Sequence, residues 1–239
     1  MRIVRIRSDK IRTELKKYKI VRINSEQKHG RNRKLRTVRI RSERCMILTS
    51  NIFNRNYIID SICTQIQSED PDEQIFKLTG ICGADINTAL NSIKQVILKN
   101  KDWIVIELYS DSDMIMGLVS ELYYSISMIT DYVDVNLNLS RFGIGKNVLK
   151  KSPIASISYA LEVLIREIKK NGKRLLIIID KAHMTKGMID FIQEFQMLIR
   201  EELPIFVVMA GSVKDVDILE NTDGITFLLR ATKYEMISL

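Results

Sequence analysis

The sequence predicts an α/β fold, in which a parallel β-sheet is sandwiched between layers of helices. Leu175–Ile179 is a run of five large aliphatic residues followed directly by Asp180. Such a run is typical of a strand buried on both faces, here with a carboxylate at its C-terminal end. Other short apolar runs alternate with segments of helical periodicity, as they do where crossover helices join parallel strands. Because ligands of these sheets bind at the carboxyl ends of strands, Asp180 is a candidate site residue.

The elements can be predicted in order from their periodicity: apolar residues recur every three or four positions in helices and are continuous or alternating in strands. The first expected segments are a helix from about Asn56 to Gln67, a polar turn at Ser68–Asp72, a strand at Ile75–Thr79 and a helix carrying Leu90, Ile93, Ile97 and Leu98. They are followed by a strand at Trp103–Leu108, a helix capped by Asp111 or Ser112 and ending near Met128, and a helix from Ser152-Pro153 to Lys170 with Asn171-Gly172 at its end. After the strand that ends at Asp180, we expect a helix capped by Thr185 and ending near Glu202, a strand at Pro204–Ala210, a short apolar segment at Ile225–Leu229 and a last strand at Tyr234–Leu239.

One further segment predicts a β-hairpin insertion. Val133–Gly145 alternates apolar and polar residues, as a half-buried strand does. The residues Gly143–Asn147 at the end of this region include a glycine and a lysine, Gly145 and Lys146, as a phosphate loop does, but no apolar helix follows them. We therefore expect a hairpin here and not a phosphate site.

Charge divides the chain into two parts. The formal net charge is +8, but residues 1–44 contain 17 Lys and Arg against 4 Asp and Glu, a charge of +13. The remaining residues contain 20 Lys and Arg against 25 Asp and Glu, a charge of −5. We therefore expect a basic N-terminal extension at residues 1–45 and a globular domain at residues 46–239.

The extension contains an internal repeat. Arg2–Lys10 recurs as Lys19–Gln27 and as Arg36–Arg44, each time at a spacing of 17 residues. Two interpretations stay open: an arm over Arg2–Arg44 that binds the phosphates of nucleic acid, or a solvated or disordered extension without a ligand. Tyr18 is the one aromatic residue in this region, so no platform for base stacking accompanies the charge.

The turn after Ile75–Thr79 has the setting of a phosphate-binding loop, because Gly80 and Gly83 separate this strand from a helix. Such a loop needs backbone N–H groups at a helix N-terminus, a Lys for the β- and γ-phosphates and a hydroxyl for Mg²⁺. Here the Lys is missing.

Two alignments with the pattern G-x-x-x-x-G-K-[ST] are open. If Gly80 is its first residue, Asp85 replaces the second Gly, Ile86 the Lys and Asn87 the hydroxyl. A shift by one residue supplies Thr88 as the hydroxyl but leaves Asn87 in the Lys position. Neither alignment restores the Lys, so we expect weakened ATP binding and inefficient hydrolysis.

The rest of the composition excludes several classes of function. Cys45, Cys63 and Cys82 lack metal-ligand spacing, and the two histidines, His29 and His183, lie in such different surroundings that no Ser/His/Asp or Cys/His constellation can be argued. No apolar run approaches the ~18 residues of a membrane span, and the N-terminus lacks the apolar region of a signal peptide. We expect a soluble, cytoplasmic protein without membrane contact.

From about Asn54 to Leu239, three quarters of its length, the chain resembles the AAA+-type ATP-binding proteins of bacteria and archaea, P-loop ATPases related to the archaeal-type and STAND-like groups. The resemblance rests on motifs in order along the chain: Asn54–Asp60, Leu78–Gly83, Asp102–Glu107, Asn138–Gly145, Lys173–Asp180, Phe195–Pro204, Met209–Gly211 and Thr226–Ala231. It implies a P-loop NTPase fold, ATP hydrolysis as the family activity, and ATP and Mg²⁺ as cofactors.

The resemblance also implies roles for single residues. Asp180 matches the Walker B acid that holds Mg²⁺, whereas Lys181 replaces the glutamate that orients the attacking water. Ser212 corresponds to a polar sensor, Arg230 to an arginine finger or sensor, and Arg55 to the border of the adenine pocket. Alternatives stay open for three of them: Asp180 as the cap of a turn, Lys181 as a solvated residue at the edge of the sheet, and Arg230 as the partner in a structural ion pair.

The departures from the family pattern fall on the catalytic positions. The chain also stops where the family's C-terminal helical or winged-helix region would begin, so we expect a degenerate, truncated copy. The predicted function is an ATP-binding AAA+-like domain with degenerate Walker A and Walker B motifs and a regulatory, pseudo-ATPase role. The alternative is a nucleotide-independent interaction protein that binds nucleic acid through its basic arm. The sequence leaves open whether the protein is an enzyme and whether it forms an oligomer.

Overall fold

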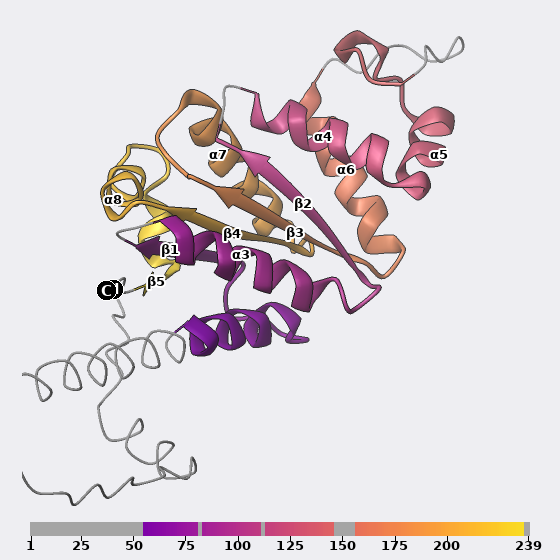
Figure 1. Cartoon of the computed structure of the whole chain (residues 1–239). Coiled ribbons are helices and arrows are strands. Elements are labelled where there is room, and N and C mark those ends of the chain that lie inside the picture. Colours follow the sequence, from indigo (N-terminus) through magenta and orange to yellow (C-terminus); the bar gives the residue numbers. More distant parts are fainter. Residues whose placement is uncertain (1–54, 81–82, 111–112, 146–155, 237–239) are drawn as a thin grey trace, which may run out of the picture. The chain divides into compact units, whose positions relative to one another are not determined.

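Five strands form one parallel sheet among the residues that a computed structural model describes, which are 55–80, 83–110, 113–145 and 156–236 (Figure 1). The strands are β1 (Ile75–Gly80), β2 (Trp103–Tyr109), β3 (Arg174–Asp180), β4 (Ile205–Gly211) and β5 (Thr232–Met236). Their order across the sheet is β2-β3-β4-β1-β5, and every neighbouring pair is parallel. The described residues belong to a unit that spans Asn51–Ser238. The basic extension predicted at residues 1–45 lies outside them.

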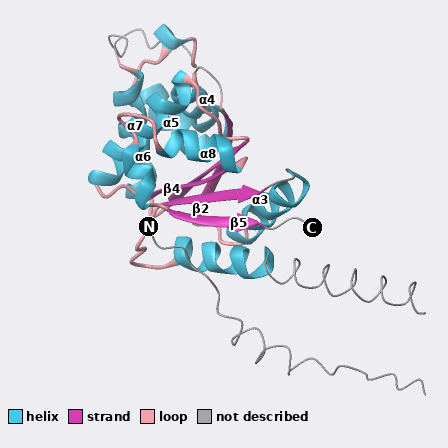
Figure 2. Ribbon diagram, turned by 90° about the vertical axis from the view of Figure 1, so that its left-hand side faces the viewer, coloured by secondary structure: helices cyan, strands magenta, loops and turns pink. Residues whose placement is uncertain are grey.

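Helices cover both faces of the sheet (Figure 2). They are the helix at residues 55–67, α3 (Gly83–Ile97), α4 (Met114–Ser125), α5 (Ser127–Asn136), α6 (Ile157–Lys170), α7 (Lys186–Arg200) and α8 (Val213–Glu220), together with the 3₁₀ helices η1 (Ser140–Phe142) and η2 (Thr226–Arg230). The helix at 55–67 and α3 pack on one face, whereas α4, α6, α7 and α8 pack on the other. The predicted α/β class and the parallel sheet between helices are confirmed.

Strand β3 lies between β2 and β4, and its packing shows why its aliphatic run is continuous. Leu175, Ile177 and Ile179 belong to the core under α4, α6 and α7, while Leu176 and Ile178 belong to the core under α3. Successive side chains of a strand point to opposite faces, so a strand covered on both faces needs an apolar residue at every position. Each such side chain contributes about 1.5–3 kcal/mol relative to its exposed state.

Capping residues mark several of the helix boundaries. Thr185 begins α7 as predicted, because its hydroxyl accepts a hydrogen bond of 3.0 Å from the backbone N–H of Met188. Ser156 caps α6 by accepting from the N–H of Tyr159 at 3.4 Å. The predicted start of this helix at Ser152-Pro153 lies outside the described residues, as do the predicted caps Asp111 and Ser112. The helix expected to end near Met128 stops at Ser125, and α5 follows it.

The predicted hairpin at Val133–Gly145 is wrong. Residues up to Asn136 belong to α5, and Ser140–Phe142 form η1. The buried residues Ile129, Val133 and Leu137 are four positions apart, which is the spacing of a helical stripe, and all three lie in the core on the α4 and α6 side. The alternation seen from Val133 onward is the end of this stripe and not the period of a strand.

The C-terminal part agrees with the sequence in outline. The apolar segment Ile225–Leu229 contributes to η2, and β5 begins at Thr232, two residues before the predicted start. None of the helices in the described residues has the length and apolar character that crossing a membrane requires.

Candidate functional site

The carboxyl ends of β1, β4 and β3 lie next to one another at one edge of the sheet. These strands end at Gly80, Gly211 and Asp180, respectively. Residues 81–82, between Gly80 and the first residue of α3, Gly83, lie outside the described residues, so what the structure describes of the expected phosphate loop is its strand and its helix. The backbone N–H groups at the start of α3 face this same edge of the sheet, the end from which a helix can bind an anion.

Ile86, in the position of the missing Lys, belongs to the hydrophobic core. Its side chain is 5% exposed and lies in the cluster that contains Phe76 and Leu78. Gly80 allows this packing, because a Cβ atom at Gly80 would lie 3.1 Å from Cδ1 of Ile86 and 3.1 Å from the carbonyl oxygen of Met236. The Ile86 side chain therefore packs against Gly80 and contributes no polar group to the site.

A small pocket brings two of the predicted site residues together. Its volume is about 170 Å³, and its lining comes from α3, β2 and β3: Asn87, Leu90, Asn91, Glu107, Leu108, Tyr109, Ile178 and Asp180. Asn87 and Asp180 share this pocket, whereas Thr88 is not among its lining residues. This geometry favours the alignment in which Asn87 takes the place of the Mg²⁺-binding hydroxyl.

Sequence reasoning missed the other polar residues of the pocket. Asn91 follows Asn87 by one helical turn, a signal that the sequence does contain. Glu107 and Tyr109 gave no comparable signal, because they alternate with buried residues of β2 as any partly exposed strand residue does. Tyr109 is 71% exposed, so its ring lies at the rim of the pocket.

The charges in the pocket favour a cation over a bare anion. The Nζ atom of Lys94 donates to Oε1 of Glu107 at 2.7 Å. The half-buried carboxylate of Asp180 makes no hydrogen bond or ion pair with another of the described residues. No cluster of three His, Cys, Asp or Glu side chains occurs in the described part of the chain. Asp180 can therefore supply one oxygen ligand to Mg²⁺, and the other ligands would be phosphate and water, as is usual for this ion.

The chain crosses the end of β4 directly after Asp180. Lys181 has a positive φ of 54°, and the N–H of Ala182 donates to the carbonyl oxygen of Ala210 at 2.7 Å. A Cβ atom at Gly211 would lie only 2.6 Å from the carbonyl oxygen of Ala182. The turn that carries Asp180 and Lys181 is therefore held against a glycine at the end of the neighbouring strand.

Ser212 caps α8 at the same edge of the sheet. Its hydroxyl accepts from the N–H of Asp215 at 3.1 Å and lies 2.6 Å from Oδ2 of the same residue, to which it donates. In this structure the candidate sensor is thus engaged in a helix cap, a role that Ser commonly fills. The hydroxyl can donate to a ligand only by giving up its bond to the Asp215 carboxylate.

The two candidate arginines lie away from the pocket lining. Arg230 is exposed at the end of η2 and makes no ion pair with another described residue, so its structural alternative finds no partner there. Arg55 is partly exposed at the start of the helix at residues 55–67. His183 is exposed, with Nδ1 2.8 Å from the carbonyl oxygen of Lys181. The structure therefore brings Asp180 and Asn87 together, and leaves both arginines outside their pocket.

Cys63 is not a candidate nucleophile. Its thiol is buried, and burial, with a smaller contribution from Asp60, raises its pKa to about 11. Because the thiolate is the reactive form, almost none is present at neutral pH.

No protein-family model matches the chain, and no curated protein matches it either. Similar solved structures include a Drosophila ORC chain bound to DNA, at 13% identity and TM-score 0.47, with 79% of this chain and 91% of that chain covered. The Aeropyrum pernix ORC2 protein in its ADP form is 12% identical with TM-score 0.42, covering 78% of this chain and 47% of the other. C. elegans PCH-2 is 9% identical with TM-score 0.41, and the match covers 76% of this chain and 42% of the other. Likenesses this low assign no function.

Proposed function

We propose that this domain binds ATP with Mg²⁺ as an AAA+-like module with degenerate Walker A and Walker B motifs. One observation carries the proposal: Gly80 and Asp180 end β1 and β3, Ser212 follows the end of β4 between them, and Asn87 shares a pocket with Asp180. A phosphate loop, a polar sensor and a Mg²⁺-binding acid need this proximity to act on one nucleotide.

The role we propose is regulatory, with weak or absent hydrolysis. Lys181 carries a positive charge where catalysis needs a carboxylate to orient water, and none of the pocket-lining residues is basic. Within the lining that the structure describes, phosphate charge would be balanced by Mg²⁺ and by the N-terminus of α3. A charged hydrogen bond to phosphate is worth about 1.5–3 kcal/mol, so its loss weakens binding about ten- to hundredfold.

Calorimetric titration of the full chain with ATP and Mg²⁺ tests this proposal. We expect binding with a Kd between micromolar and sub-millimolar values, and a loss of the Mg²⁺ dependence in Asp180→Ala, because this variant lacks the metal ligand. Asp190→Ala is the matched control, since Asp190 is an exposed carboxylate on α7 outside the pocket. Millimolar ATP that produces neither heat nor a shift in melting temperature would show that the site is vestigial.

A second candidate function is nucleic-acid binding through Arg2–Arg44. It is favoured by the charge of +13 and by the three repeats, whose equivalent arginines are Arg5, Arg22 and Arg39. Replacing these three with Gln in the full chain should reduce the slope of log Kd for single- or double-stranded DNA against log salt by about 2–3, because each lost phosphate contact removes about 0.7–0.9.

The control for this titration replaces three exposed lysines of the domain, Lys99, Lys101 and Lys214, with Gln. Its net charge falls by the same amount as in the triple arginine variant. Equal slopes for the two variants would mean that the repeats have no special part in binding. The wild-type slope would then reflect overall charge.

A further inference from the structure

A lysine is buried within the interior strand β1, where an apolar residue is expected. Lys77 occupies the middle of β1, all six residues of which are buried, and it is itself 1% exposed. Its side chain lies on the same face of β1 as Ile75, which packs in the core that contains Leu219 and Leu228. A buried ammonium group is costly unless it is paired and hydrogen-bonded.

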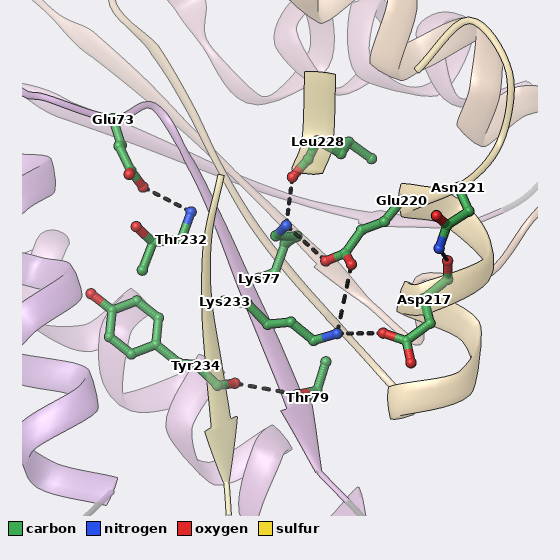
Figure 3. Close-up of polar contacts among 10 residues, drawn as sticks. All are labelled: Glu73, Lys77, Thr79, Asp217, Glu220, Asn221, Leu228, Thr232, Lys233 and Tyr234. Carbon is green, nitrogen blue, oxygen red and sulfur yellow. Dashed lines mark hydrogen bonds and ion pairs between the residues drawn. The ribbon is translucent and has the colours of Figure 1, made fainter. Parts of the chain in front are cut away.

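The partners of Lys77 come from two separate segments (Figure 3). Its Nζ atom lies 2.7 Å from Oε1 of Glu220, in α8, and donates to the carbonyl oxygen of Leu228, in η2. Burial lowers the pKa of Lys77, and the adjacent Glu220 carboxylate opposes this shift. Both segments belong to the connection between β4 and β5, which we call the β4–β5 crossover (residues 212–231).

The contacts continue outward from this buried pair. Oε2 of Glu220 lies 3.7 Å from Nζ of Lys233, which also pairs with Oδ1 of Asp217 (Figure 3). The side chains are 2% exposed at Lys77, 11% at Glu220, 30% at Lys233 and 52% at Asp217. The strongest interactions are therefore expected at the innermost pair, since screening by solvent weakens the outer ones.

Apolar contacts alone would leave the position of the crossover poorly defined. In η2, the buried Leu228 is followed by Leu229, which is half exposed, so a shift by one residue would still bury a leucine. In α8, a small rotation would exchange Glu220 for other residues while keeping Leu219 near the core. Among the contacts of the described residues, the hydrogen bond to the Leu228 carbonyl and the ion pair with Glu220 are the most buried polar contacts that distinguish the observed arrangement from these neighbours.

We infer that the Lys77–Glu220 pair is a positioning device, which sets the register of the β4–β5 crossover on β1. Replacing a buried ion pair with apolar residues is often neutral or stabilising, so net stability does not explain why the pair is present. Specifying one arrangement among several of similar energy does explain it. The pair thereby also sets the places of Ser212 and Arg230, the residues near the two ends of the crossover, whether or not the domain binds a nucleotide.

Single and double substitutions in the full chain test the inference. Lys77→Met and Glu220→Gln should each lower the melting temperature by about 6–20 °C, because each removes one member of the buried ion pair and leaves the other charge without its 2.7 Å contact. The double variant Lys77→Met/Glu220→Met should recover most of this loss. Its backbone amides in α8 and η2 should nevertheless exchange with solvent at least tenfold faster than in the wild type, with the rest of the sheet unchanged.

The matched control is the pair Lys94 and Glu107, which has the same 2.7 Å distance and also joins a helix to a strand, but is 32% and 45% exposed. Lys94→Met/Glu107→Met should shift the melting temperature by less than about 4 °C. Three results would overturn the inference. The amides of α8 and η2 in the Lys77/Glu220 double variant could exchange as slowly as in the wild type, or the single variants could be as stable as the control. The double variant could also be as unstable as the single variants. The last result would make the pair a requirement for stability.

Discussion

An Ile86→Lys variant should have a free energy of unfolding about 3–5 kcal/mol below that of the wild type. The substitution restores the Lys of the phosphate-loop pattern in sequence. In the structure, however, the Ile86 side chain is buried among Phe76 and Leu78 beneath Gly80, so the new ammonium group would enter an apolar core. The loss combines the transfer energy of the aliphatic side chain with the cost of a buried, unpaired charge. Denaturant unfolding followed by circular dichroism measures it.

Asn87→Lys is the matched variant, because it introduces the same side chain one position further along α3. Asn87 is exposed and lines the pocket beside Asp180, so the expected change in stability is within about 0.5 kcal/mol. If the pocket binds ATP, this variant should also tighten binding about tenfold or more. The opposite result, a stable Ile86→Lys protein with tighter ATP binding, would mean that residue 86 can turn out of the core toward the phosphates.

Gly211→Ala should lower the free energy of unfolding by about 3 kcal/mol. The added Cβ atom would lie 2.6 Å from the backbone oxygen of Ala182 and 3.2 Å from Cγ2 of Val216. A backbone oxygen cannot rotate away as a side chain can, so the turn after Asp180 must shift or the end of β4 must distort. Thermal and denaturant unfolding give the size of the loss, and nucleotide titration shows whether displacing Asp180 affects binding.

Gly117→Ala is the control for this prediction. Gly117 lies within α4, and a Cβ atom there would meet only Cδ2 of Leu108 at 4.0 Å, an ordinary contact. Because Ala has a higher helix propensity than Gly, this variant should be up to about 1 kcal/mol more stable than the wild type. If Gly211→Ala were as stable as this control, the chain after Asp180 could not lie as close to β4 as described.

Local patterns predicted most of the helices and strands, because each depends on periodicity within a short segment. The aliphatic run of β3, the Thr185 cap of α7 and the strand, glycine turn and helix around Gly80 are all such cases. The same approach failed at Val133–Gly145, where a window starting at Val133 excluded Ile129 and so missed the helical stripe. A short apolar alternation fits both periods, and packing decides between them.

The candidate site was predictable only in part. Asp180 and the glycine turn were recognisable because each follows an apolar strand. The choice between Asn87 and Thr88 was not, since both lie in the first turns of α3 and only the position of β3 shows which one shares a pocket with Asp180. For Ile86, the sequence showed that the Lys is absent, and the structure showed that the side chain is part of the core.

The sequence by itself determined the α/β class and the acid at the C-terminal end of β3. Tertiary structure alone decided the place of Lys77. Lys77 and Thr79 alternate along the strand with Phe76 and Leu78. From sequence alone, this alternation indicates a strand with one face in solvent. α8 and η2 cover that face, and they supply Glu220 and the Leu228 carbonyl from more than 140 residues away. The sequence of a strand shows which residues share a face. Whether that face is buried depends on distant segments, which no local pattern encodes.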